Sequence, residues 1–133
     1  CASSLIPKGT LIISTRMAIG NVAIYDVDVA INQDLKAIFT KSLLLPEFLF
    51  FWFRLNANKL ECIGGGSTVK GISLQDLRKI QISYPAISEQ RAIASSLFDI
   101  DADINALERE LAKTQMIKQG MMQELLTGRI RLV

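Results

Sequence analysis

Apolar and polar residues follow two different patterns along the chain, and the change from one to the other falls near Pro85. Before this proline, short apolar runs are separated by turn residues, which is typical of short strands and helices. After it, apolar residues recur in steps of three and four with almost no glycine or proline, which is typical of a helix. The pattern therefore predicts two parts: an α+β domain at residues 1–87 and a long helix at residues 88–133.

The first part begins with short apolar runs, and we expect each of them to form a strand. These predicted strands lie at residues 10–15, 21–25, 29–31 and 35–39. Gly20 supplies a turn between the first two. A last alternating run, at residues 80–84, predicts a half-buried strand that ends at Pro85.

Two helices are predicted between these strands. Over residues 45–58 the apolar period becomes helical, and Pro46 suits the first turn because its missing N–H is not needed there. The apolar run at residues 48–53 predicts a buried helix of about three turns. Ser73 is a suitable N-cap for a second, short helix at residues 74–78.

The second part carries a single apolar stripe with the a/d spacing of coiled coils. Ser88 is predicted to cap its helix, with Glu89 next to the positive end of the helix dipole. The stripe consists of Ile93, Leu97, Ile100, Ile104, Leu107 and Leu111 and, after two polar positions, of Met121 and Leu125. The acidic stretch at residues 99–103 leaves open whether the helix is continuous or bends there.

A continuous helix of about 40 residues would be about 60 Å long, whereas a compact globule of this size has a radius of gyration of about 14 Å. We therefore expect the stripe to pack against a similar helix from another copy or another subunit. The alternative is that it packs on the chain's own domain.

The charge of the helix favours one orientation of such a pair. Residues 89–110 hold six acids and two bases, whereas residues 111–133 hold four bases and one acid. Parallel helices would set acid against acid, whereas antiparallel helices set each acidic half against a basic half. We therefore predict an antiparallel coiled coil, although part of the asymmetry also suits the helix dipole.

The composition narrows the chemistry. The chain has no histidine, which excludes a Ser-His-Asp triad, a Cys-His dyad and an HExxH zinc site. Its two cysteines, Cys1 and Cys62, are not spaced like metal ligands. We expect no metal site, no cofactor and no catalytic residues. Half of the residues are apolar and the net charge is only +2, so most of the chain is predicted to fold.

The longest apolar run, at residues 48–53, is far shorter than the roughly 20 residues of a membrane-spanning helix. The first residues also lack the layout of a signal peptide. We therefore expect a soluble cytoplasmic protein. The start at Cys1 rather than at a methionine indicates a fragment, or a processed or trimmed product.

A series of short motifs, in order along nearly the whole chain, resembles the specificity subunit of type I restriction–modification systems, and in particular its C-terminal half-repeat. The motifs are residues 9–14 (GTLIIS), 18–21 (AIGN), 32–33 (NQ), 66–68 (GST), 72–73 (IS), 80–85 (IQISYP), 88–90 (SEQ), 93–94 (IA), 100–101 (ID) and 118–129 (KQGMMQELLTGR). Each motif alone is weak, and their order and spacing carry the resemblance.

The resemblance implies a DNA target-recognition domain followed by a conserved spacer helix. In that family two such helices pack antiparallel and fix the distance between two half-sites. The subunit is not an enzyme: it holds the methyltransferase subunits, and through them the restriction subunits, on double-stranded DNA. A full subunit has two recognition domains, with further strands before the position of Leu5. This chain therefore resembles a half-subunit with an incomplete domain, of a kind that dimerises.

The candidate DNA contacts lie in the first part, which holds nine bases and six acids. Basic side chains bind phosphates, arginine reads guanine, and asparagine or glutamine reads adenine. Lys8 and Lys41 are further phosphate candidates, while residues 32–33 fit a structural turn better than a base reader. The glycine-rich stretch lacks the spacing of a nucleotide-binding loop. The predicted DNA-binding residues are Arg16, Lys36, Gly65, Ser67, Thr68 and Lys70.

Two alternatives to this function stay open. One is a dimerisation or spacer fragment that does not bind DNA, and the other is a small enzyme such as a nuclease. The second lacks any convergent carboxylate cluster to support it. The apolar stripe and residues 118–129 are the expected surface for self-association or for a methyltransferase subunit. Neither the DNA target nor the oligomeric state follows from the sequence.

Overall fold

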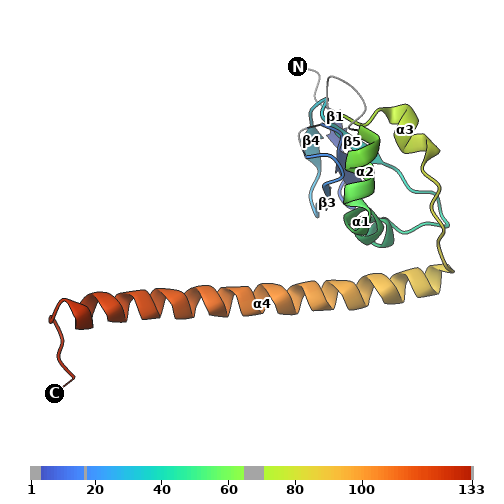
Figure 1. The fold of residues 1–133 in the computed structure, drawn as a ribbon. Coiled ribbons are helices and arrows are strands. Elements are labelled where there is room, and N and C mark those ends of the chain that lie inside the picture. The colour runs from blue at the N-terminus through green and yellow to red at the C-terminus, as the bar shows by residue number, and fades with distance from the viewer. Residues whose placement is uncertain (1–3, 17, 65–70, 133) are drawn as a thin grey trace. The chain divides into compact units, whose positions relative to one another are not determined.

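A computed structural model describes residues 4–16, 18–64 and 71–132 of the chain. The chain divides into two compact units, Cys1–Ser95 and Ser96–Val133. The first unit contains all the strands and three short helices, and Figure 1 shows their order along the chain. The last helix, α4 (Ile87–Leu126), begins in the first unit and makes up most of the second.

In the described part of the first unit, five short strands form two antiparallel sheets. A three-stranded sheet has the order β3 (Val22–Ile24), β2 (Leu11–Ser14), β5 (Leu35–Ile38). A two-stranded sheet pairs β1 (Ser4–Ile6) with β4 (Val29–Ile31). The predicted strands at residues 10–15, 21–25, 29–31 and 35–39 are confirmed, with slightly shorter bounds for three of them. Strand β1 was not among the predicted strands.

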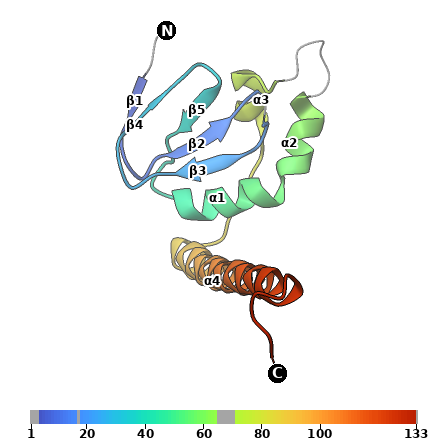
Figure 2. The same cartoon turned by 90° about the vertical axis from the view of Figure 1, so that its left-hand side faces the viewer.

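The central strand β2 is buried on both faces. Leu11 and Ile13 belong to a core cluster with Leu49 and Phe53, while Ile12 belongs to a second cluster on the other side of the strand. Successive side chains of a strand point to opposite faces, so a strand covered on both sides needs apolar residues at every position. Figure 2 shows β2 between β3 and β5, with α1 (Pro46–Leu55) across the sheet.

The predicted buried helix of about three turns is confirmed, although it is shorter than the helical pattern at residues 45–58, and the helix that follows it was not predicted. Helix α1 has Pro46 in its first turn, as expected, but it ends at Leu55. The buried Asn56 follows, and its side-chain amide donates to the Trp52 carbonyl at 2.8 Å. This bond gives the chain a local alternative to the helical ladder, and α2 (Ala57–Gly64) begins immediately afterwards.

Not every residue of the apolar run is buried as the sequence predicted. Leu49 and Phe53 face the core, whereas Phe50 and Trp52 are only half-buried against it. Leu55, which the helical pattern placed on the apolar face, is 84% exposed. Because α1 is covered by the sheet on one side only, its apolar face is narrower than the sequence suggests.

Gly20 forms the predicted turn between β2 and β3, and its conformation requires glycine. Its φ is +84°, a region that other residues rarely adopt. A Cβ atom there would also lie 3.2 Å from a methyl carbon of Leu60 and 3.3 Å from the Cα of Ala57. This turn therefore sets how closely α2 packs on the sheet.

Residues 80–84 are not a strand, which corrects the prediction. Ser73 caps α3 (Leu74–Lys79) as expected, since its hydroxyl accepts the Asp76 N–H at 3.1 Å, and the chain then runs on without regular structure. Ile80 and Ile82 are half-buried and pack against the core, so the predicted alternation is present. A strand also needs a hydrogen-bonded neighbour, and the described residues provide none for this segment.

Helix α4 starts two residues before Glu89, the predicted first helical residue. A buried side chain holds this start of the helix. It begins at Ile87, so Ser88 lies inside its first turn rather than at the cap. Gln90 is completely buried. Its side-chain oxygen accepts the Leu45 N–H at 2.9 Å, and its amide donates to the carbonyls of Leu43 (2.9 Å) and Pro85 (2.8 Å). These bonds tie the first turn of α4 to the segment that leads into α1.

The remainder of α4 is continuous. The helix passes through residues 99–103 without a break and ends at Leu126. Its end is the predicted glycine cap, with a φ of +71° at Gly128. The Gly128 N–H donates to the Leu125 carbonyl at 3.2 Å, and the Arg129 N–H to the Glu124 carbonyl at 3.0 Å, which together form a Schellman motif.

Replacing Gln90 by leucine should destabilise the first unit. The apolar side chain fills a similar volume but leaves one N–H and two carbonyl groups buried without their partners, at a cost of about 2–4 kcal/mol. Urea unfolding of the full chain measures this loss. The matched control is Gln115→Leu, at an exposed position of the same helix, which should change the free energy of unfolding by less than about 0.5 kcal/mol. Equal effects of the two substitutions would contradict the role given to Gln90.

Candidate functional site

One end of the three-stranded sheet brings together residues that are far apart in the sequence. Strand β2 ends where β5 begins, with Ser14 opposite Leu35 and Ile13 opposite Lys36. Beyond the strands, the Thr15 N–H and hydroxyl both donate to the Asp34 carbonyl at 2.9 Å. The Thr15 carbonyl accepts the Ile72 N–H at 2.9 Å. Three segments, around residues 15, 34 and 72, are thus joined by backbone hydrogen bonds. We call this region the basic end of the sheet, after Arg16 and Lys36.

Arg16 lies directly after β2 and forms an ion pair. Its guanidinium nitrogen is 3.2 Å from a carboxylate oxygen of Asp34, and the two side chains are 55% and 37% exposed. That oxygen accepts no hydrogen bond, so the contact is an electrostatic attraction without a hydrogen bond. An exposed pair of this kind contributes little to stability. The guanidinium group of Arg16 is therefore accessible to another anion that binds it more strongly than Asp34 does.

Lys36 is half-buried at the start of β5 and is held by a local contact. Its ammonium group donates to the Gln33 carbonyl at 2.7 Å. Since Ile13 faces Lys36 across the strand pair, the lysine is fixed by the same register that places Arg16 after β2. The sequence named both residues as candidates, and the structure brings them to one end of the sheet.

Asn32 acts as a turn residue, as the sequence interpretation favoured. Its side-chain oxygen accepts the Asp34 N–H at 3.0 Å, and its carbonyl accepts the Leu35 N–H at 3.3 Å. This arrangement is an Asx-turn that leads into β5. Asn32 therefore shapes the loop that carries Asp34 and Lys36.

The remaining predicted DNA-binding residues, Gly65, Ser67, Thr68 and Lys70, lie outside the described residues. The next residue, Gly71, is described and lies against the basic end of the sheet. A Cβ atom on it would be 3.2 Å from the Thr15 carbonyl oxygen and 3.6 Å from a side-chain carbon of Arg16. The chain thus leaves the glycine-rich stretch directly beside Arg16.

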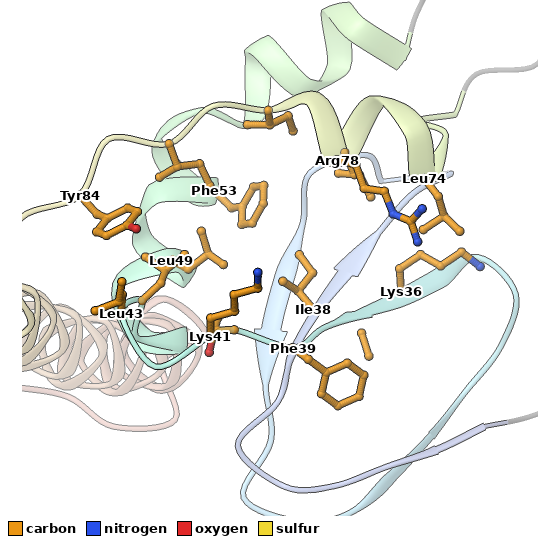
Figure 3. A pocket seen from close by; sticks show the side chains of 16 residues that line it. Lys36, Ile38, Phe39, Lys41, Leu43, Leu49, Phe53, Leu74, Arg78 and Tyr84 are labelled. Atoms are coloured by element: carbon orange, nitrogen blue, oxygen red, sulfur yellow. The ribbon is translucent and has the colours of Figure 1, made fainter.

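Sequence reasoning missed Arg78. It lies in the last turn of α3, and it lines a groove together with Lys36 (Figure 3). The sequence signal was a basic residue near the end of a predicted helix. Such a residue can equally serve only to stabilise the negative end of the helix dipole. Only the groove, which Arg78 and Lys36 both line, distinguishes the two roles.

The apolar stripe of α4 is largely uncovered in the single chain. Six of the stripe residues are exposed. Their exposed fractions range from 36% for Ile93 to 64% for Leu107. Leu97 and Leu125 are half-buried. Further apolar residues are exposed on the same helix, namely Phe98, Met116, Ile117 and Met122. The described residues thus present a long apolar surface on one helix.

Two classes of site find no support in the structure. Within residues 4–16, 18–64 and 71–132, no three acidic or cysteine side chains are grouped so that they could hold a metal ion. Of the helices in the described part of the chain, none is both long enough and apolar enough to cross a lipid bilayer.

Comparison with known proteins identifies relatives of the chain. Residues 1–119 match the family described as the type I restriction modification DNA specificity domain. The putative type I restriction enzyme MjaX specificity subunit of Methanocaldococcus jannaschii is 34% identical over 122 residues, which are 91% of this chain and 29% of that protein. The MjaIX specificity subunit of the same organism is 33% identical over 103 residues, 76% of this chain and 24% of that protein.

Solved structures share the fold. A chain from a study of complex assembly and conformational transition of the type I R-M system matches with a TM-score of 0.77 and 23% identity, over 93% of this chain and 32% of that one. The HsdS subunit from Thermoanaerobacter tengcongensis matches with a TM-score of 0.68 and 22% identity, over 90% and 30% of the two chains. The predicted α+β fold with a long C-terminal helix is thereby confirmed. The chain spans about a third or less of each of these proteins.

Proposed function

Since the chain belongs to the type I restriction modification DNA specificity family, we propose that its first unit recognises double-stranded DNA and that α4 pairs it with a second copy. The family match over residues 1–119 carries the proposal. The supporting geometry is the basic end of the sheet, where Arg16, Lys36 and the flank of the glycine-rich stretch converge. In this account the chain has no catalytic role, since its family is defined by DNA specificity.

The proposed contacts divide into two kinds. Arg16, Lys36 and Lys70 neutralise phosphates, because cations beside turns and glycine-rich backbone can approach the duplex closely. Gly65, Ser67 and Thr68 are proposed as further DNA contacts from the sequence, through the N–H groups of their backbone. Arg16 has a second possible role, since a guanidinium group can form two hydrogen bonds to guanine. Asp34 opposes both roles by its negative charge beside Arg16.

We further propose that two copies of α4 pack antiparallel along their apolar stripes. The spacing of the stripe positions is the same in both directions from Arg109. Two antiparallel helices that cross at Arg109 therefore place every stripe position opposite a stripe position of the partner. In that register Ile93 faces the partner's Leu125, and Leu97 faces the partner's Met121. The apolar surface that is exposed in the single chain would then be buried over the whole stripe.

The two polar positions of the stripe also favour this orientation. A parallel pair in register would set Lys118 against the partner's Lys118 inside the seam, which like charges disfavour. The antiparallel register instead sets Lys118 opposite the partner's Ile100, next to Asp99 and Asp101 of the partner. The same arrangement places the acidic first half of each helix beside the basic second half of the other.

The outer surface of the pair is available for other subunits. We propose that residues 118–129 and the faces of α4 outside the seam hold methyltransferase subunits, and that restriction subunits join through these. Arg129 is already oriented by an ion pair with Glu124 at 2.9 Å, on a helix end fixed by the glycine cap. The chain would thus act as a DNA-reading scaffold.

A second candidate is a pairing fragment that does not bind DNA. It is favoured by the contacts of Arg16 with Asp34 and of Lys36 with the Gln33 carbonyl, because both cations already have partners. The binding experiment below separates the two candidates.

The full chain should bind a random-sequence duplex with an affinity that falls as salt rises. Arg16→Ala and Lys36→Ala should each weaken binding and lower the slope of log affinity against log salt by about 0.9 for each phosphate contact that is lost. Lys59→Ala is the matched control, since Lys59 is an exposed lysine on α2 that is not among the candidate DNA contacts. Fluorescence anisotropy across a salt series gives both quantities.

Asp34→Asn supplies the opposite change in the same assay. It removes the negative charge beside Arg16, so the affinity for the duplex should rise. An intact chain without measurable salt-dependent binding would favour the pairing fragment instead. Equal losses for Lys59→Ala and Arg16→Ala would show that the basic end of the sheet has no special role.

Disulfide crosslinking should report the antiparallel register. In a background with Cys1 and Cys62 replaced by serine, a mixture of the Ile93→Cys and Leu125→Cys chains should form the mixed crosslink, because only that pair reaches the short Cα separation of a disulfide. Each variant alone should crosslink poorly. Efficient crosslinking of like to like, without the mixed product, would contradict the antiparallel pair.

A further inference from the structure

An apolar groove of about 580 Å³ lies on the first unit beside strand β5. Its floor is formed by core side chains that include Leu49 and Phe53, and Figure 3 shows them between β5 and the segment at residues 80–84. The groove extends to α3 at one end. It is distinct from the apolar stripe of α4, none of whose residues lines it.

Both long sides of this groove are extended backbone, and among the described residues neither side pairs with a strand across the groove. Strand β5 is an edge strand, since it pairs only with β2 among the described residues. On the other side, residues 80–84 have the alternating sequence and the half-buried pattern of a strand but belong to no sheet in the described part of the chain. An edge strand presents unpaired N–H and carbonyl groups and is a template for another strand.

The rim of the groove has one sign of charge. Lys36, Lys41 and Arg78 line it, and no acidic residue does. Large apolar side chains are also exposed around it, with Phe39 at 69% and Leu43 at 63%. Exposed apolar side chains at a concave, positively charged rim are typical of a surface that binds a partner.

From these observations we propose that the groove receives a β-strand from another polypeptide chain. The strand lies between β5 and residues 80–84 and forms main-chain hydrogen bonds with β5. Its alternate apolar side chains fill the groove, and its acidic residues meet Lys41 and Arg78. This is strand addition, in which main-chain bonds give affinity and side-chain pockets give specificity.

The chemistry of the groove favours a peptide over a nucleic acid. A duplex backbone needs cations along its track and cannot fill a floor of leucine, isoleucine and phenylalanine side chains. An extended peptide satisfies both the apolar floor and the unpaired strand edge. Lys36 lines the groove and is also a proposed DNA contact, whereas Phe39 and Leu43 line the groove and are not among the candidate DNA contacts, so variants at these two positions test the groove separately.

The test uses a fluorescent peptide of about six residues, with valine and glutamate alternating, titrated with the full chain. It should bind, and the same peptide with its glutamates replaced by lysines should bind at least about tenfold more weakly. A third peptide carries N-methyl groups on alternate backbone amides along one edge, which removes the donors but keeps the side chains. This peptide should also bind at least about tenfold more weakly than the unmodified acidic peptide, because strand addition requires these donors.

Variants of the chain locate the site. Phe39→Ala and Arg78→Glu should each weaken peptide binding by about fivefold or more, consistent with losing an apolar contact or reversing a rim charge. The matched controls are Leu55→Ala and Lys59→Glu, at exposed positions that do not line the groove. These control substitutions should leave the affinity for the peptide unchanged. Phe39→Ala should also leave duplex binding unchanged, which separates this site from the proposed DNA surface.

Several results would overturn the proposal. These are absence of binding by the acidic peptide, equal binding of the N-methylated peptide, and equal effects of the groove and control variants. Competitive displacement of the peptide by duplex DNA would assign the groove to nucleic acid. A smaller sedimenting mass of the free Phe39→Ala chain would assign it to a second copy.

Discussion

The uncovered apolar stripe of α4 is the constraint on which the function of the chain depends. A forty-residue helix with large apolar side chains exposed along most of its length cannot remain uncovered in water without a strong tendency to associate. A symmetric stripe, with acids in one half and bases in the other, limits the partners that can cover it. The proposed antiparallel second copy would satisfy the shape and the charge together. This proposed pairing would give each assembly two copies of the first unit.

The first unit has its own requirement, which the buried Gln90 meets. A completely buried amide is stable only when its donors and acceptor are satisfied, and here two carbonyls and one N–H from residues 43, 45 and 85 do so. The first turn of α4 thereby belongs to the fold of the first unit and not only to the helix. Gln90 lies in one of the motifs that carry the family resemblance. Its physical role involves residues more than forty positions away, so no local pattern could reveal it.

Local patterns predicted much of the fold, and the failures have a common cause. The alternating and helical periods located four strands, the Pro46 helix start, the Ser73 cap and the glycine end of α4, because each depends on neighbouring residues. The absence of a strand at residues 80–84 depends instead on what packs beside that segment. The basic end of the sheet is similar: Arg16 and Lys36 were named separately, but their convergence follows from the register of β2 and β5. Arg78 was missed because only the packing of α3 places it near Lys36.

The central claim is that identical DNA-reading units are paired by a two-fold antiparallel helix seam. Selection of bound sequences from a random duplex library by the full chain tests it most directly, because a two-fold symmetric dimer binds a site with the same symmetry. The account predicts enrichment of two identical half-sites in inverted orientation, separated by a spacer of fixed length and free sequence. A single half-site, a direct repeat or no enrichment at all would contradict it.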